Sequence, residues 1–263
     1  DITVYKGYVE TLNSLFDITE EDEEKIQPIN KPYSKNDFLK EVFISEQKYE
    51  KLVNLLERKR NIILQGAPGV GKTFAAKRLA YSIIGEIDKE RVQMVQFHQS
   101  YSYEDFIMGY RPNENGFVKT PGIFYEFCKK AEIDKDNKYF FIIDEINRGN
   151  LSKIFGELLM LIEKDKRGQQ LQLLYSKELF SIPSNLYIIG MMNTADRSLA
   201  IIDYALRRRF AFVEFEPAFE TESTSFENLK NSVENLNYPK LIEKIKILNR
   251  YISDDQSLGK GFR

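Results

Sequence analysis

An eight-residue stretch, residues 66–73, constrains the fold of this chain most strongly. It reads GAPGVGKT and fits the pattern G-x-x-x-x-G-K-[ST] of phosphate-binding loops. Residues 61–65, which contain the apolar run Ile-Ile-Leu, predict a short buried strand, and residues 74–84 predict a helix. Glycines let a backbone wrap around a phosphate, and the N–H groups that begin the helix then point at the anion. The stretch therefore predicts a phosphate site, because a glycine-rich turn without a ligand would not need the Lys-Thr pair or these flanks.

Two residues of the loop are expected to contact the phosphates and a metal ion. Lys72 would reach the β- and γ-phosphates of a nucleotide, and Thr73 would hold Mg²⁺. The predicted nucleotide-binding residues are Gly66, Ala67, Pro68, Gly69, Val70, Gly71, Lys72, Thr73, Phe74 and Asp144.

An acidic pair, Asp144 and Glu145, follows the apolar segment 139–143, which predicts a central strand buried on both faces. In a hydrolytic P-loop protein, acids at this place hold the metal and activate water. Asp144 would coordinate Mg²⁺ directly or through water, and Glu145 would orient or deprotonate the attacking water. A pair that only caps the next helix is the alternative, which the upstream loop disfavours. Arg148, just beyond, is either a contact between subunits or a helix-surface arginine.

A second polar cluster follows the buried strand predicted at residues 186–191, and it contains Asn193, Asp196 and Arg197. Ligands bind at the carboxyl ends of strands in α/β sheets. Asn193 is expected to contact a γ-phosphate oxygen or the attacking water, with Asp196 and Arg197 as an ion pair that positions it. The N-x-x-D pattern also resembles the guanine-reading loop of small GTPases, but two fixed residues in four make that alternative weaker.

Three consecutive arginines, Arg207 to Arg209, precede a strand predicted at residues 210–216. Such a cluster of charge is costly unless an anion or an acidic partner compensates it. A solvated turn would explain an isolated triplet. Here the order of loop, acidic pair, asparagine and arginines favours an arginine finger that acts on the nucleotide of a neighbouring subunit. Arg208 and Arg209 are the leading candidates.

Composition sets further limits. The chain of 263 residues is 42% hydrophobic and 30% charged, which suffices for a packed core. The net charge of −2 gives no global basic field for nucleic acid. A single cysteine, Cys128, excludes an internal disulfide framework and a cysteine-based zinc site. No apolar run is long enough for a membrane span and no signal-peptide pattern is present, so we expect a cytoplasmic protein.

Strands predicted at residues 62–65, 92–97, 139–143, 186–191 and 210–216 alternate with helical patterns. This alternation predicts an α/β fold, with a parallel sheet covered by helices on both faces. We expect an N-terminal arm or linker over residues 1–30, a nucleotide-binding core over 31–217, and an incomplete α-helical lid over 218–263. A helical periodicity covers residues 34–56, and a β-hairpin is expected at 171–183. The chain ends favour a piece of a longer protein.

The motifs in this order resemble the AAA+ P-loop ATPases, and three segments are similar to McrB proteins, the motor subunits of the McrBC systems that restrict modified DNA. The segments are VQMVQFHQSYSYEDFIMGYRP at residues 92–112, IIDEINRGNLSKIFGELLMLIE at 142–163 and MNTADRSLAIIDYALRRRF at 192–210. The resemblance covers residues 31–263, most of the chain.

The resemblance implies GTP as nucleotide, with Mg²⁺, and a homo-oligomeric, hexameric ring. It implies a McrC-like endonuclease partner that stimulates weak GTP hydrolysis, and DNA translocation by the assembled complex. Asn193, Asp196 and Arg197 fall on the family's MNxxDR signature, which responds to that partner. Residues 1–30 are too short for the family's N-terminal reader of modified bases, so the resemblance implies an isolated motor.

Three alternatives remain open at the level of sequence. An ATP-driven MoxR-like remodelling motor shares the D-E-I-N-R segment and would prefer ATP. A nucleotide-dependent ring scaffold would bind nucleotide without significant turnover, which the complete set of acids, asparagine and arginines disfavours. A DNA-specificity module is disfavoured by the net charge and the missing reader. The base-binding surface is expected near Val42, Phe43 and Ile44 and from the lid.

Overall fold

The computed structural model describes residues 30–114, 116–194, 204–221, 223–233 and 238–254. The elements below lie in one unit, residues 33–263. The strands are β1 (Asn61–Gly66), β2 (Val92–Gln96), β3 (Met108–Asn113), β4 (Gly116–Pro121), β5 (Tyr139–Asp144), β6 (Leu171–Gln172), β7 (Leu179–Phe180), β8 (Leu186–Asn193) and β9 (Ala211–Glu214). The α-helices are α3 (Lys35–Glu41), α4 (Glu46–Lys59), α5 (Lys72–Ile84), α6 (Tyr103–Phe106), α7 (Ile123–Ile133), α8 (Leu151–Phe155), α9 (Tyr204–Arg209), α10 (Thr224–Ser232) and α11 (Tyr238–Asp254).

Five parallel strands form the central sheet in the order β2-β5-β8-β1-β9. β1 lies between β8 and β9, with Gly66 opposite Asn193 and Ile62 opposite Ala211. Because the strands are parallel, their carboxyl ends meet at one edge. This register brings the phosphate-binding loop, the acidic pair and Asn193 to the same edge of the sheet.

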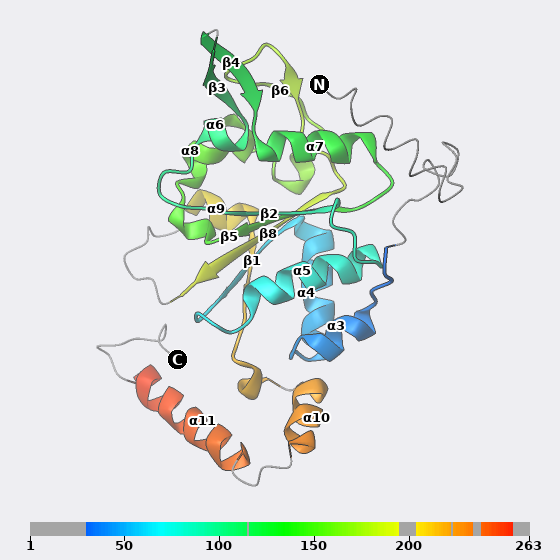
Figure 1. The fold of residues 1–263 in the computed structure, drawn as a ribbon, viewed down its shortest axis with the longest axis vertical. Coiled ribbons are helices and arrows are strands. Elements are labelled where there is room, and N and C mark those ends of the chain that lie inside the picture. The colour runs from blue at the N-terminus through cyan, green and yellow to red at the C-terminus, as the bar shows by residue number, and fades with distance from the viewer. Residues whose placement is uncertain (1–29, 115, 195–203, 222, 234–237, 255–263) are drawn as a thin grey trace, which may run out of the picture. The chain divides into compact units, whose positions relative to one another are not determined.

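Helices cover both faces of the sheet (Figure 1). On one face, Ile62, Leu64 and Phe140 pack in a core with residues of α3, α4 and α5. On the other face, Ile63 and Phe141 pack with residues of α6, α7 and α8. Successive side chains of a strand point to opposite faces, so a strand that is covered on both faces is apolar over most of its length. The predicted α/β architecture is confirmed.

Two antiparallel hairpins extend from the helical face that carries α6, α7 and α8. β3 pairs with β4, and β6 pairs with β7, which confirms the hairpin expected within residues 171–183. Carboxylates anchor the second hairpin, since Glu157 accepts hydrogen bonds from Tyr103 Oη (2.7 Å) and from the backbone N–H of Leu174 (2.9 Å).

The helical periodicity of residues 34–56 is interrupted in the structure. α3 ends at Glu41, Val42 is extended with φ −110° and ψ 120°, and a new helix begins after the cap residue Ser45. Ser45 accepts a hydrogen bond from the Lys48 N–H at 3.2 Å, which satisfies an N–H group at the start of the helix. The helical pattern predicted over these residues is therefore divided between α3 and α4, and the short break places Val42 and Phe43 outside a helix.

The predicted boundaries at residues 30 and 217 stay predictions, and the arm over residues 1–29 lies outside the described part of the chain. Between β9 and α10 a short 3-10 turn, Ala218–Glu220, begins the C-terminal segment. No helix in the described residues is long and apolar enough to cross a bilayer.

Candidate functional site

The loop between β1 and α5 has the backbone that a phosphate cradle requires. Gly69 and Gly71 have φ values of 82° and 88°, in the left-handed region that side chains with a Cβ disfavour. Gly66 is required for another reason. A Cβ built there would lie 2.2 Å from the carbonyl oxygen of Phe215, so the loop approaches the chain after β9 too closely for any side chain.

Lys72 is held at the centre of the site. Its Nζ donates hydrogen bonds to the Gly66 and Ala67 carbonyl oxygens at 3.0 and 2.8 Å, and to Asn193 Oδ1 at 2.8 Å. The side chain is 7% exposed. Burial lowers the pKa of Lys72, while the nearby Glu145 and Asp144 carboxylates act in the opposite direction. A phosphate would supply the strong negative partner that this buried amine lacks in its present contacts.

Thr73 and Asp144 form an oxygen pair that fits Mg²⁺. Thr73 Oγ1 lies 3.5 Å from Asp144 Oδ2, at the carboxyl end of β5. Mg²⁺ in nucleotide sites takes one or two protein oxygens and completes its shell with phosphates and water. No cluster of three or more His, Cys, Asp or Glu side chains suited to a metal occurs in the described residues. Thr73 Oγ1 and Asp144 Oδ2 are two oxygen atoms of the type that nucleotide-bound Mg²⁺ takes from a protein.

Glu145 and Asn193 are joined by a short hydrogen bond, with Asn193 Nδ2 donating to Glu145 Oε1 at 2.6 Å. Glu145 has φ 49° and ψ 44°, a left-handed conformation that is uncommon outside glycine. Strain of this type persists where the surrounding structure fixes it and concentrates at functional sites. The other oxygen, Oε2, is buried and lies 3.4 Å from Arg148 Nε, so Arg148 reaches back toward the site.

The amide of Asn193 therefore bridges Lys72 and Glu145. Its oxygen accepts from the lysine and its nitrogen donates to the carboxylate, which fixes both partners with one side chain. The Thr194 N–H also donates to the Gly66 carbonyl at 3.1 Å, which ties the end of β8 to the loop. The structure thus brings together the loop, Asp144, Glu145 and Asn193, as the sequence predicted. Asp196 and Arg197 lie outside the described residues.

The two candidate finger arginines differ in their surroundings. Arg209 Nε lies 3.0 Å from Glu163 Oε1, and the two side chains are 17% and 30% exposed. Arg208 is exposed, and no ion pair or hydrogen bond joins its guanidinium to the described part of the chain. Neither belongs to the loop–acid–asparagine cluster. Of the two, Arg208 is the side chain that can extend toward another subunit without breaking a contact seen here.

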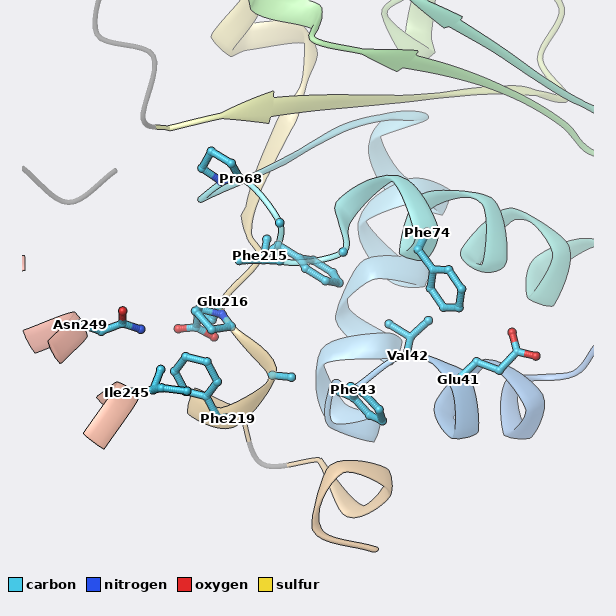
Figure 2. A pocket seen from close by; sticks show the side chains of 15 residues that line it. Glu41, Val42, Phe43, Pro68, Phe74, Phe215, Glu216, Phe219, Ile245 and Asn249 are labelled. Carbon is cyan, nitrogen blue, oxygen red and sulfur yellow. The ribbon is translucent and has the colours of Figure 1, made fainter. Parts of the chain in front are cut away.

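A cavity of about 660 Å³ adjoins the phosphate-binding loop. The lining is mainly apolar and aromatic: Glu41, Val42, Phe43, Pro68, Gly69, Val70, Gly71, Phe74, Phe215, Glu216, Pro217, Ala218, Phe219, Ile245 and Asn249. In Figure 2, Pro68 of the loop lies above Phe43 and Phe219. A flat aromatic ring attached to a phosphate at the loop would fit such a cavity.

Phe215, which follows the last strand, had no signal in the sequence. Phe219, Ile245 and Asn249 lie within residues 218–263, the segment predicted as a lid that contributes to the base-binding surface. Of the three residues predicted to lie near the base, Val42 and Phe43 line the cavity, whereas Ile44 is 3% exposed in the core and is not part of the lining. Phe74, predicted to bind nucleotide, is 44% exposed at the cavity with the Arg78 guanidinium 3.3 Å above its ring centroid.

Comparisons with known proteins agree with this geometry. The model of the AAA domain family (dynein-related subfamily) matches residues 61–210, from the first strand to the end of the arginine helix. The type IV methyl-directed restriction enzyme EcoKMcrB subunit of Escherichia coli (strain K12) is 54% identical over 246 residues, covering 90% of this chain and 54% of the relative. The resemblance to McrB proteins is thereby confirmed.

A second relative is the type II restriction enzyme BsuMI component YdiS of Bacillus subtilis (strain 168). It is 28% identical over 197 residues, covering 60% of this chain and 57% of the relative. The chain spans about half the length of these two curated relatives.

Proposed function

Because the chain belongs to the AAA domain family (dynein-related subfamily), and is similar to an McrB subunit over most of its length, we propose that it is the GTP-binding and GTP-hydrolysing motor part of a McrBC-like restriction complex. The observation that carries this proposal is the bridge of Asn193 between Lys72 and Glu145. It joins the phosphate-binding lysine to a carboxylate able to activate water, which a loop that only binds nucleotide would not need.

The residues act as follows. Lys72 binds the β- and γ-phosphates, and it exchanges its carbonyl and amide partners for phosphate oxygens. Thr73 and Asp144 hold Mg²⁺, which neutralises charge on the phosphates when bound. Glu145 accepts a proton from the attacking water or orients it, while Asn193 fixes the carboxylate on one side and contacts the γ-phosphate on the other.

An arginine from a neighbouring subunit would complete the site. Among the described residues, Lys72 donates to the phosphate-binding loop, whereas Arg148 is paired with Glu145 at 3.4 Å, so the charge that develops on the γ-phosphate would need a further cation. Arg208 is exposed at the end of α9 and is the preferred donor, with Arg209 as its neighbour. This arrangement requires a homo-oligomeric ring, for which a hexamer is expected from the resemblance.

The larger assembly is also part of the proposal. A McrC-like endonuclease would bind the ring and stimulate hydrolysis through the segment that contains Asp196 and Arg197. DNA would be translocated by the assembled complex and recognised elsewhere than in this AAA+ part. We propose the cytoplasm as its location, because its relatives are components of bacterial restriction enzymes.

Parallel GTP and ATP turnover assays of the assembled protein test the proposal, with a McrC-like partner and with Glu145→Gln as the matched blank. We expect Mg²⁺-dependent GTP hydrolysis that the partner raises and the variant abolishes, while GTP binding by the variant is retained. Preference for ATP would instead support a MoxR-like remodelling motor. Tight GTP binding without turnover in the presence of partner and DNA would support a ring scaffold.

A further inference from the structure

A buried asparagine at the start of β1 contacts the helix that carries the arginines. Asn61 is 0% exposed, and its Nδ2 donates to the carbonyl oxygens of Ile162 and Arg209 at 2.7 and 3.1 Å. Both amide hydrogens are therefore used, and one of them binds the last residue of α9. The opposite amide orientation would set a carbonyl oxygen against two others, so the surroundings fix this one.

Arg167 holds the other end of the same amide. Its Nη2 donates to Asn61 Oδ1 at 2.8 Å, and its Nε donates to the Ile162 carbonyl at 3.0 Å. A third bond, from Nη1, reaches the Pro183 carbonyl at 3.5 Å. The planar guanidinium of Arg167 thus binds both Asn61 Oδ1 and the Ile162 carbonyl, which fixes the direction in which Asn61 Nδ2 points.

The same end of α9 is also held through its side chain. Arg209 is paired with Glu163, the residue after the shared acceptor Ile162. The backbone carbonyl of Arg209 is therefore held by Asn61, and its side chain is held by Glu163. This double attachment leaves Arg208, one residue earlier, exposed at a fixed place on the surface.

We infer that Asn61, clamped by Arg167, is a positioning residue for the arginine that acts on the neighbouring subunit's nucleotide. The inference rests on the proposed function, since it concerns how the trans-acting arginine is placed. Asn61 and Gly66 are the two ends of β1. One strand therefore carries the phosphate-binding loop of its own site at one end and steadies the arginines for the next site at the other.

A subunit-mixing experiment tests this inference. Asn61→Asp keeps the side-chain size and an oxygen toward Arg167, but turns a carboxylate oxygen toward two carbonyls. We expect its ring to bind GTP normally and to hydrolyse it about 100-fold more slowly, the cost of an angstrom-scale misplacement. The Asn61→Asp subunits are then mixed in equal amounts with Glu145→Gln subunits, whose arginines are correctly placed. The mixture should reach about a quarter of the wild-type rate, because about one interface in four joins a site with an intact Glu145 to a correctly placed arginine.

Two controls separate the possible failures. Asn185→Asp is the matched variant, because Asn185 Nδ2 also donates to backbone carbonyls, those of Ala131, Asp134 and Asn137, and none of these belongs to α9. It should keep wild-type turnover. Arg208→Ala mixed with Glu145→Gln should recover activity in the same way as the Asn61 mixture.

Recovery in the Arg208 mixture but not in the Asn61 mixture would overturn the inference alone, since Asn61 would then act on its own site. No recovery in either mixture would overturn the trans-acting arginine and the inference with it. If Asn61→Asp does not fold, Arg167→Lys, which keeps the charge and loses the clamp, takes its place in the same mixtures with the same expected recovery.

Discussion

The different surroundings of Arg208 and Arg209 lead to opposite expectations for two alanine variants. Arg208→Ala removes an exposed side chain with no partner in the described residues, so the free energy of unfolding should change by less than about 0.5 kcal/mol. Arg209→Ala removes a half-buried ion pair with Glu163 at 3.0 Å. After allowance for its exposure, that pair contributes at most about 1 kcal/mol, which corresponds to a Tm lower by about 2–4 °C.

Activity should rank the other way. A trans-acting arginine accelerates phosphoryl transfer by a factor of about 10³ or more, so Arg208→Ala should lower kcat by that order in the ring. Arg209→Ala disturbs only the placement of Arg208 and should lower kcat about 10- to 100-fold. Thermal melting of each variant without nucleotide and GTP turnover in the ring measure both quantities on the same preparations.

The reasoning would be refuted by the reverse pattern. If Arg208→Ala kept turnover near the wild-type value while Arg209→Ala abolished it with an unchanged Tm, Arg209 would be the finger and its pairing with Glu163 would be incidental. Glu163→Gln is the control, because it removes the ion pair and keeps both arginines. Glu163→Gln should lower the Tm by about as much as Arg209→Ala does, and it should lose no more GTP turnover than that variant.

Three further predictions follow from the site and the core. Asn193→Ala removes the bridge between Lys72 and Glu145, so kcat should fall about 100- to 1000-fold, while calorimetry should still detect GTP binding. A normal kcat would exclude the bridge from catalysis. Gly66→Ala places a Cβ 2.2 Å from the Phe215 carbonyl oxygen and should lower the free energy of unfolding by about 1–3 kcal/mol. An unchanged Tm would contradict this close approach. Burial raises the pKa of the Cys128 thiol, so maleimide should label it only on unfolding, and rapid labelling of folded protein would show that it is accessible.

Much of the site could be predicted because its parts are local. The loop, the acidic pair and Asn193 each follow an apolar run that can only be a buried strand, and parallel strands place such ends at one edge. The hairpin within residues 171–183 was likewise marked by its own sequence. For these features, neighbouring residues contain enough information to locate the chemistry.

The remaining features depend on residues far apart in the chain. Whether Arg208 or Arg209 is engaged depends on Glu163, which is distant from α9 in the sequence and contacts it only in the folded chain. Asn61 reads as one polar residue before an apolar run, and only the structure gives it two carbonyl partners. The break at Val42 is short and apolar. The sequence therefore keeps a helical pattern of apolar residues at a place where the backbone is extended.

The rate of GTP hydrolysis per subunit, measured across a dilution series with sedimentation at the same concentrations, tests the central claim most directly. The claim is that the chain carries the phosphate-binding and water-activating residues Lys72, Asp144, Glu145 and Asn193, but that hydrolysis also needs an arginine from a neighbouring subunit. The rate per subunit should rise with concentration in step with assembly, while GTP remains bound by the dilute monomer. A rate per subunit that stays constant down to the monomer would contradict the claim.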